Sequence, residues 1–137
     1  MNVQFVAGFG PIVPDDRLGA ASTLYEDVLG IALEHDGDYL HTGGLEGAKH
    51  FAIWPLSQAA ESCFGRQEWP SELPVPQAWL EFDVEDMGEA TRELERAGYR
   101  PLVANREEPW GQAVTRLLSP EGLLVGAQTV RPKPRPT

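Results

Sequence analysis

The sequence contains a single cysteine and no long hydrophobic run. Cys63 has no second cysteine with which to form an internal disulfide, so we expect a cytoplasmic location. No apolar stretch approaches the roughly 20 residues of a membrane-spanning helix. Residues 1–4 show neither the basic region nor the apolar core of a signal peptide. The sequence therefore predicts a soluble globular protein with no membrane partner.

Basic residues are also scarce. The chain has 11 Lys and Arg against 21 Asp and Glu, which gives a formal net charge of −10. Nucleic-acid binding depends on clustered Lys and Arg side chains that contact phosphates. We therefore expect no nucleic-acid partner. A neutral or cationic small molecule fits this charge better, although acidity also serves solubility.

What the sequence does contain is one pattern that occurs twice. Residues 5–30 indicate an apolar strand, an acidic turn and a helix that must stop at Gly30. Residues 79–98 repeat this order and end at Gly98. The two copies are separated by about half the chain, and such a period predicts two similar supersecondary units.

The second copy shows the pattern most clearly. Its strand alternates two kinds of residue, Trp79, Glu81 and Asp83 against Leu80, Phe82 and Val84, which is typical of a strand with two different faces. We expect the apolar face to pack on the following helix, which Asp86 caps. The predicted buried side of that helix is formed by Met87, Ala90, Leu94 and Ala97. The other face of the strand then contacts solvent or a ligand.

Both halves indicate the order strand, helix, strand, strand, strand. The strands are expected at 3–13, 31–34, 39–42 and 49–54, and again at 79–84, 100–104, 113–118 and 123–130. Asp15 or Asp16 is expected to cap the first helix. This predicts an α+β fold of two βαβββ modules in one domain, 1–130. Module one covers 1–54, a connector with a short helix capped by Ser57 covers 55–76, and module two covers 77–130. The basic, proline-rich tail 131–137 is expected to be disordered.

Four short motifs accompany this order of elements. They are Leu24-Tyr25 with Val28-Leu29-Gly30, the segment 82–86, Trp110-Gly111, and the segment 119–122. Together they resemble the vicinal oxygen chelate superfamily, which includes glyoxalase I, extradiol dioxygenases, fosfomycin-inactivating enzymes and bleomycin-binding resistance proteins. The resemblance covers nearly the whole chain. It implies that the mixed sheets curl into a cup that binds a ligand inside, and that the protein is a homodimer.

Enzymes of this superfamily usually hold a divalent metal on one side chain from each of four strands. Carried over strand by strand, these positions fall at Gly8 or Phe9, near Ala52, at Trp79 and at Gly126. None of these side chains is a ligand for such an ion. The resemblance therefore implies that this chain has lost the metal and uses no cofactor. A register shift of two residues would instead bring His50 or Glu81 onto the same faces, which leaves a divalent metal open.

Aromatic residues replace the metal ligands in this alignment, and they can stack on flat or cationic ligands. The candidate ligand-binding residues are Phe9, Tyr39, His50, Trp54, Trp79, Glu81 and Trp110. In this set His50 and Glu81 supply the polar contacts that orient a ligand. The alternative is that the tryptophans only fill two cores.

The leading hypothesis is a metal-independent binding protein of the bleomycin-resistance type, without catalytic residues, that sequesters an aromatic or cationic natural product. One alternative is a metal-dependent lyase, isomerase or dioxygenase that uses His50 and Glu81, with His41 as a further ligand. Another is a metal-free enzyme in which Glu81, desolvated beside Trp79, acts as general base.

Overall fold

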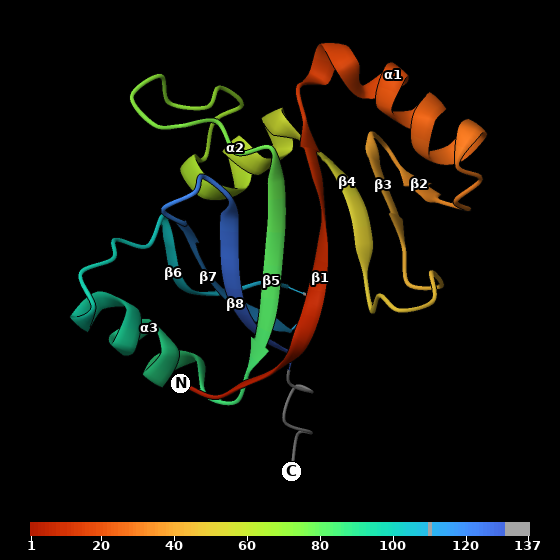
Figure 1. Ribbon diagram of the computed structural model, residues 1–137. Coiled ribbons are helices and arrows are strands. Elements are labelled where there is room, and N and C mark those ends of the chain that lie inside the picture. The colour runs from red at the N-terminus through yellow and green to blue at the C-terminus, as the bar shows by residue number, and fades with distance from the viewer. Residues whose placement is uncertain (110, 131–137) are drawn as a thin grey trace.

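The computed structural model describes residues 1–109 and 111–130 (Figure 1). Module one contains β1 (Val3–Val13), the helical turns η1 (Asp15–Arg17), α1 (Leu18–Ser22) and η2 (Thr23–Val28), then β2 (Glu34–Asp36), β3 (Tyr39–Thr42) and β4 (Phe51–Pro55). The connector contains α2 (Leu56–Phe64). Module two contains β5 (Ala78–Val84), α3 (Met87–Arg96), β6 (Val103–Glu107), β7 (Gln112–Leu118) and β8 (Leu124–Val130).

All described strands belong to one mixed sheet with the order β2-β3-β4-β1-β5-β8-β7-β6. In each module the first strand pairs parallel with the last, β1 with β4 and β5 with β8. The modules join through the antiparallel pair of β1 and β5 in the middle. This confirms two βαβββ modules, and it shows that a single chain supplies both halves of the sheet.

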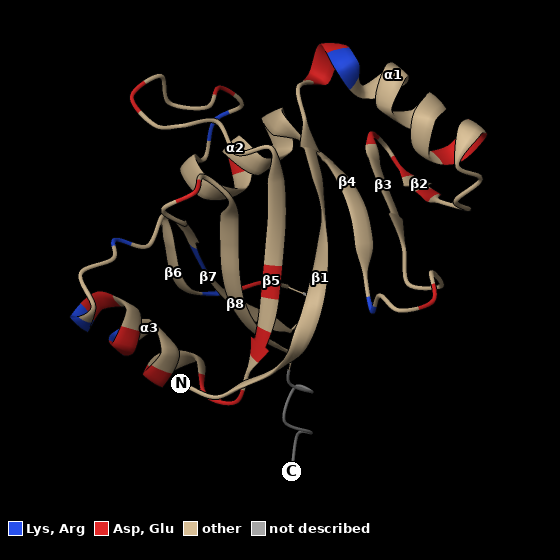
Figure 2. Cartoon of the chain, in the orientation of Figure 1, with Lys and Arg blue, Asp and Glu red and all other residues tan. Residues whose placement is uncertain are grey.

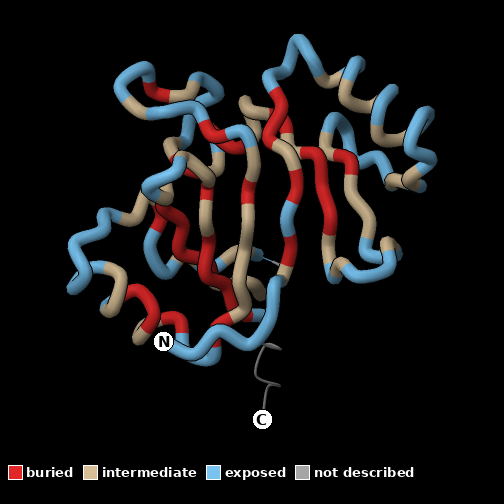
Figure 3. Tube along the Cα trace, in the orientation of Figure 1, coloured by how far each residue is buried: buried red, intermediate tan, exposed pale blue. Residues whose placement is uncertain are grey.

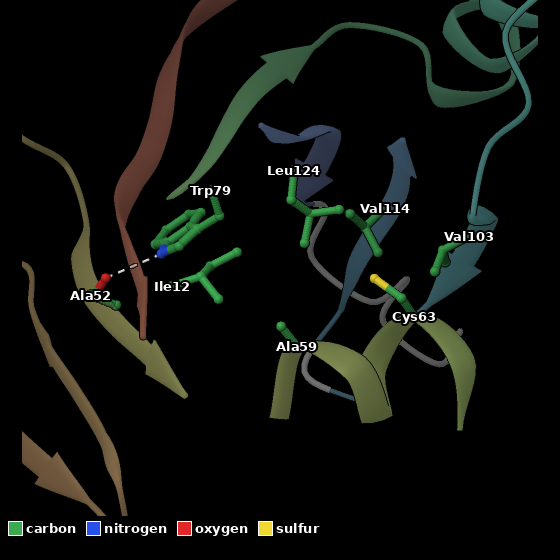
Figure 4. Packing of buried hydrophobic residues seen from close by; sticks show 8 residues of the cluster. All are labelled: Ile12, Ala52, Ala59, Cys63, Trp79, Val103, Val114 and Leu124. Carbon is green, nitrogen blue, oxygen red and sulfur yellow. Dashed lines mark hydrogen bonds between the residues drawn. The ribbon is translucent and has the colours of Figure 1, made fainter. Parts of the chain in front are cut away.

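Helices cover the sheet on both of its faces. The first helical segment packs on one side of module one, where Tyr25 and Leu18 meet Phe51 and Ile53. α3 packs similarly on module two through Met87, which meets Val84 and Ala127. The opposite face holds a third apolar cluster, in which α2 contributes to a core shared by both modules: Ile12, Ala52, Ala59, Cys63, Trp79, Val103, Val114 and Leu124 (Figure 4). Buried positions accordingly run along the central strands, while the helices expose one side (Figure 3).

The second helix forms largely as predicted. The Asp86 side chain accepts a hydrogen bond from the backbone N–H of Glu89 at 3.0 Å, which confirms the N-cap. Met87 and Ala90 are buried. Ala97, predicted on the buried side, is exposed because the helix ends at Arg96. Thr91 is buried instead, and its hydroxyl donates to the backbone oxygen of Met87.

Asp15 or Asp16 was predicted to cap the first helix, and this is wrong. Neither residue nor any other side chain caps η1 or α1. Asp15 instead accepts hydrogen bonds from the backbone N–H of Ser57, at 2.9 Å, and from the Ser57 hydroxyl. Ser57 therefore does not cap α2, which begins at Leu56. The pair ties the end of β1 to the start of α2.

Two strands differ most from the expected ranges. β2 starts at Glu34 rather than at residue 31, because Ile31 and Leu33 pack under the helix without pairing. β6 starts at Val103, after the turn that closes α3. Trp110 and the tail 131–137 lie outside the described residues. No helix in the described ranges has the length and apolar character needed to cross a membrane.

Candidate functional site

A cavity of about 730 Å³ lies between α2 and the face of the sheet that carries Trp54 and Glu81. Strands from both modules line it, together with one side of α2. The lining residues are Asp36, Tyr39, His50, Trp54, Gln58, Glu61, Ser62, Trp79, Glu81, Arg106, Glu108, Gln112 and Arg116. A cavity of this size accommodates a drug-sized molecule.

A row of four residues crosses the middle of this face. Gly8 of β1 is opposite Glu81 of β5, and Glu81 is beside Gly126 of β8. On the other side, the backbone oxygen of His50 accepts from the N–H of Phe9. The row is therefore Gly8, His50, Glu81 and Gly126. The expected positions at Gly8, near Ala52, at Trp79 and at Gly126 therefore do not share one row, because Gly8 and Gly126 lie beside Glu81, whereas Trp79 lies beside Gly10 and Leu124.

The two glycines of the row leave room for their neighbours. A Cβ at Gly8 would lie 2.8 Å from Cη2 of Trp79, and one at Gly126 would lie 2.9 Å from Cγ of Glu81. Both distances are too short for non-bonded carbons. The side chains of Trp79 and Glu81 thus occupy the space that side chains at positions 8 and 126 would need.

The residues of the row do not fit a divalent metal of the superfamily type. Only His50 and Glu81 offer side-chain donors, and within residues 1–109 and 111–130 no group of three or more His, Cys, Asp or Glu could hold an ion. Glu81 is already paired, because its Oε1 accepts from Nη2 of Arg116 at 3.1 Å. A fixed guanidinium at this place repels a cation.

Arg116 is the central residue that sequence reasoning missed. Its side chain is 10% exposed and that of Glu81 is 14% exposed, so the ion pair is largely desolvated. The guanidinium lies 5.3 Å from the Trp54 ring centroid and also donates to Oγ of Ser62 at 2.8 Å. Figure 2 shows the acidic positions within β5. One signal could have indicated this role, namely a single charge within the otherwise uncharged strand segment 112–118.

A second arginine joins the same cluster. Arg106 donates to both the backbone oxygen and the hydroxyl of Ser62, at 2.5 and 2.9 Å. Its Nε donates to Oε1 of Glu108 at 2.9 Å. Ser62 of α2 is therefore held by two guanidinium groups, which fixes α2 over the cavity.

Trp79 belongs to the core as well as to the cavity. It is only 5% exposed, and its indole N–H donates to the backbone oxygen of Ala52 at 3.1 Å (Figure 4). Trp54 is less buried and meets Trp79 edge to face, with 6.3 Å between ring centroids. Trp54 therefore offers more accessible ring surface to a ligand than Trp79 does.

Tyr39 and His50 form a neutral pair on the module-one side. The Tyr39 hydroxyl and Nε2 of His50 are hydrogen-bonded at 2.8 Å. Burial raises the pKa of Tyr39 far above its usual range. Burial, and next the neighbouring His41, lowers the pKa of His50. Both groups are uncharged at neutral pH. Nδ1 of the neighbouring His41 lies 3.7 Å from Oε2 of Glu34.

The structure brings most of the candidate residues together. Five of them line the cavity, namely Tyr39, His50, Trp54, Trp79 and Glu81. Phe9 was expected on the inner face but lies on the outer one, where its ring packs edge-on against Phe51 at 5.7 Å. The physical reason is the alternation of β1, which gives the inner face to Gly8 and Gly10. Trp110 is outside the described residues.

Comparison with known proteins supports the same fold. A member of the glyoxalase/bleomycin resistance protein/dioxygenase superfamily from Vibrio splendidus 12B01 has a TM-score of 0.60 and 14% identity, over 93% of this chain and 99% of that one. Methylmalonyl-CoA epimerase from Mycobacterium tuberculosis has a TM-score of 0.55 and 21% identity, over 96% and 91%. 2,2',3-Trihydroxybiphenyl 1,2-dioxygenase from Sphingomonas wittichii RW1 has a TM-score of 0.59 and 16% identity, over 97% of this chain and 43% of that one.

At such identities the likeness to these structures shows the fold alone. The comparison with curated proteins gave no match. The family model described as "Glyoxalase/Bleomycin resistance protein/Dioxygenase superfamily" matches residues 6–126. Because this match spans most of the chain and agrees with the paired βαβββ modules, the chain belongs to the glyoxalase/bleomycin resistance protein/dioxygenase superfamily, as its repeated pattern and motifs predict.

Proposed function

We propose that this protein binds a small aromatic or cationic natural product in its cavity without a metal ion, and so sequesters it. The observation that carries the proposal is the Glu81–Arg116 ion pair, because Glu81 and His50 are the two residues of the row that could donate to a metal. A buried pair of this kind is costly to break, because the remaining charge loses its partner. Glu81 is therefore committed to Arg116 rather than to an ion.

Aromatic side chains favour a flat ligand. Tyr39, Trp54 and Trp79 all line the cavity, and large rings give contact area with little rotamer entropy to lose. Two exposed carboxylates, Asp36 and Glu61, also line it. Together with the net charge of −10 they favour a ligand that carries positive charge.

Tryptophan fluorescence tests this proposal. The protein is titrated with acridine-type planar cations and with aliphatic amines of equal charge. We expect quenching by the planar compounds only. Trp54→Leu should weaken their binding about tenfold, since stacking on an aromatic ring contributes about 1 kcal/mol or more. Trp69→Leu is the matched control, because Trp69 packs on Phe64 in the connector and does not line the cavity. Equal responses to planar and aliphatic amines would contradict the proposal.

A metal-dependent enzyme is the second candidate function. It is favoured by the position of His50 and Glu81 within the row, and two of the similar structures are an epimerase and a dioxygenase. Metal analysis after dialysis separates the two functions. A stoichiometric divalent metal that is retained by the wild type and lost in His50→Ala would support the enzyme.

We also propose a cytoplasmic homodimer. The cytoplasmic location is supported by Cys63, which is a buried free thiol. The dimer is supported by β1, whose segment 3–13 carries no charge and exposes Phe5 and Phe9 by 41% and 40%. Light scattering should give the mass of two chains for the wild type and of one chain for Phe9→Lys. Val28→Lys, at an exposed apolar residue outside β1, should stay dimeric. A monomeric wild type would overturn the dimer.

A further inference from the structure

The cavity has two chemically different sides. Its aromatic and imidazole residues Tyr39, His50 and Trp54 come from the β3–β4 half of the sheet, whereas Arg106, Glu108, Gln112 and Arg116 come from the β6–β7 half. The strands β1, β5 and β8 separate these halves. A ligand that fills the cavity therefore meets mainly rings toward β3–β4 and mainly hydrogen-bonding groups toward β6–β7, and the Arg116 guanidinium reaches the Trp54 ring between them.

In the β6–β7 half of the cavity, the charged side chains cancel in pairs. Arg116 pairs with Glu81 at 3.1 Å and Arg106 pairs with Glu108 at 2.9 Å. Ser62 links the pairs, because both guanidinium groups donate to its hydroxyl. An anionic group placed here would meet the two carboxylates, and a cationic group would meet the two guanidinium ions. Neither sign gains a net attraction from the cluster.

Hydrogen-bonding capacity remains on the same side. A guanidinium has more N–H donors than the bonds of Arg116 to Ser62 and Glu81 use, and a carboxylate accepts at both oxygens. Gln58 of α2 adds an amide that both donates and accepts. The group that fits such a surface is neutral and carries several hydroxyls, because each hydroxyl can accept from an arginine and donate to a carboxylate.

We infer that the ligand carries a neutral polyhydroxylated group, such as a sugar ring, attached to its planar ring system, so that the cavity takes an aromatic glycoside. This inference rests on the proposed binding function and specifies the ligand class. A cavity of about 730 Å³ has room for both parts. The planar part lies against Tyr39 and Trp54, and the sugar lies among Gln58, Glu81 and Arg106. If the ligand also carries a positive charge, that charge lies nearer the exposed carboxylates of Asp36 and Glu61.

Calorimetric titration with four naphthyl probes tests the inference on the whole protein. The probes share one ring system and differ only in the attached group: 2-naphthyl β-D-glucoside, 2-naphthol, 2-naphthyl phosphate and trimethyl(2-naphthyl)ammonium. We expect the glucoside to bind at least tenfold more tightly than 2-naphthol, because hydrogen bonds to charged groups give about that factor each. 2-Naphthyl phosphate should bind no more tightly than 2-naphthol.

Variants localise the effect. Gln58→Leu should weaken binding of the glucoside by about tenfold and leave binding of 2-naphthol unchanged. Gln67→Leu is the matched control, since Gln67 is exposed on the connector and does not line the cavity. Unfolding midpoints of both variants establish that they are folded.

The outcomes separate the inference from the function on which it rests. Equal affinities for glucoside and 2-naphthol, a preference for the phosphate, or an unchanged glucoside affinity in Gln58→Leu would overturn the glycoside and leave aromatic binding intact. If no naphthyl probe binds, the proposed function fails as well.

Discussion

At the scale of single residues, Arg116 decides the chemistry of the cavity. It pairs with Glu81 at 3.1 Å from its place opposite Gly126, and it lies over the Trp54 ring as well. One side chain thus neutralises the Glu81 carboxylate, lies over an aromatic ring and repels a metal ion from Glu81. The whole functional proposal depends on this pair.

The buried pair leads to a stability prediction. Arg116→Met leaves the Glu81 carboxylate without its partner, and we expect the free energy of unfolding to fall by about 3 kcal/mol. The double variant Arg116→Met with Glu81→Met should recover most of this loss, because replacing both charges by apolar groups is nearly neutral. Urea unfolding measures both. A single variant as stable as the wild type would show that the pair is not desolvated.

His50 leads to a pH prediction. Its pKa in the folded protein is lowered, first by burial, so the unfolded chain binds more protons just below the ordinary histidine pKa of about 6.5. The contribution of His50 to stability is therefore complete above that pKa and is lost as pH falls below it. Urea unfolding between pH 7.5 and 5.5 should show a smaller loss in His50→Gln than in the wild type. The exposed His35→Gln serves as control, and equal slopes for His50→Gln and wild type would contradict the prediction.

At the scale of elements, Gly10 sets the distance between β1 and β4. A Cβ at this position would lie 1.8 Å from the backbone oxygen of Ala52, which no side-chain movement relieves. Gly10→Ala should therefore lower the free energy of unfolding by about 3 kcal/mol or more. Gly19→Ala in α1 is the matched control, since its Cβ meets nothing within 4 Å, and it should be neutral or stabilising. Equal stability of the two variants would show that β1 can shift.

Elements whose caps and stops lie nearby in sequence could be predicted, and elements held by distant partners could not. α3 has its cap at Asp86 and its stop at Gly98, where φ is +94°, both within a few residues of the helix. α2 is held by partners far away in sequence, because Ser57 binds Asp15 and Ser62 binds Arg106 and Arg116. No local pattern indicates such contacts, so the role of the connector in the cavity could not be read from the sequence.

At the scale of the whole molecule, the repeated pattern predicted the fold, but it could not fix the register of the strands. Alternation tells which face a side chain occupies, and a slip of two residues keeps every side chain on that face. His50 and Ala52 share one face, as do Trp79 and Glu81. The sequence could therefore name these residues as neighbours of the cavity without deciding which of them lie in the row. The pairing of Gly8 with Glu81 and the hydrogen bond from the Phe9 N–H to the His50 oxygen decide it.

The measurement that tests the central claim most directly is the affinity of a planar aromatic probe with and without a divalent metal. The wild-type protein is titrated calorimetrically with 2-naphthyl β-D-glucoside in excess chelator, and again with added zinc or manganese. Because Arg116 rather than an ion is the partner of Glu81, we predict the same dissociation constant in both conditions. Binding that disappears in chelator and returns with one equivalent of metal would contradict this account.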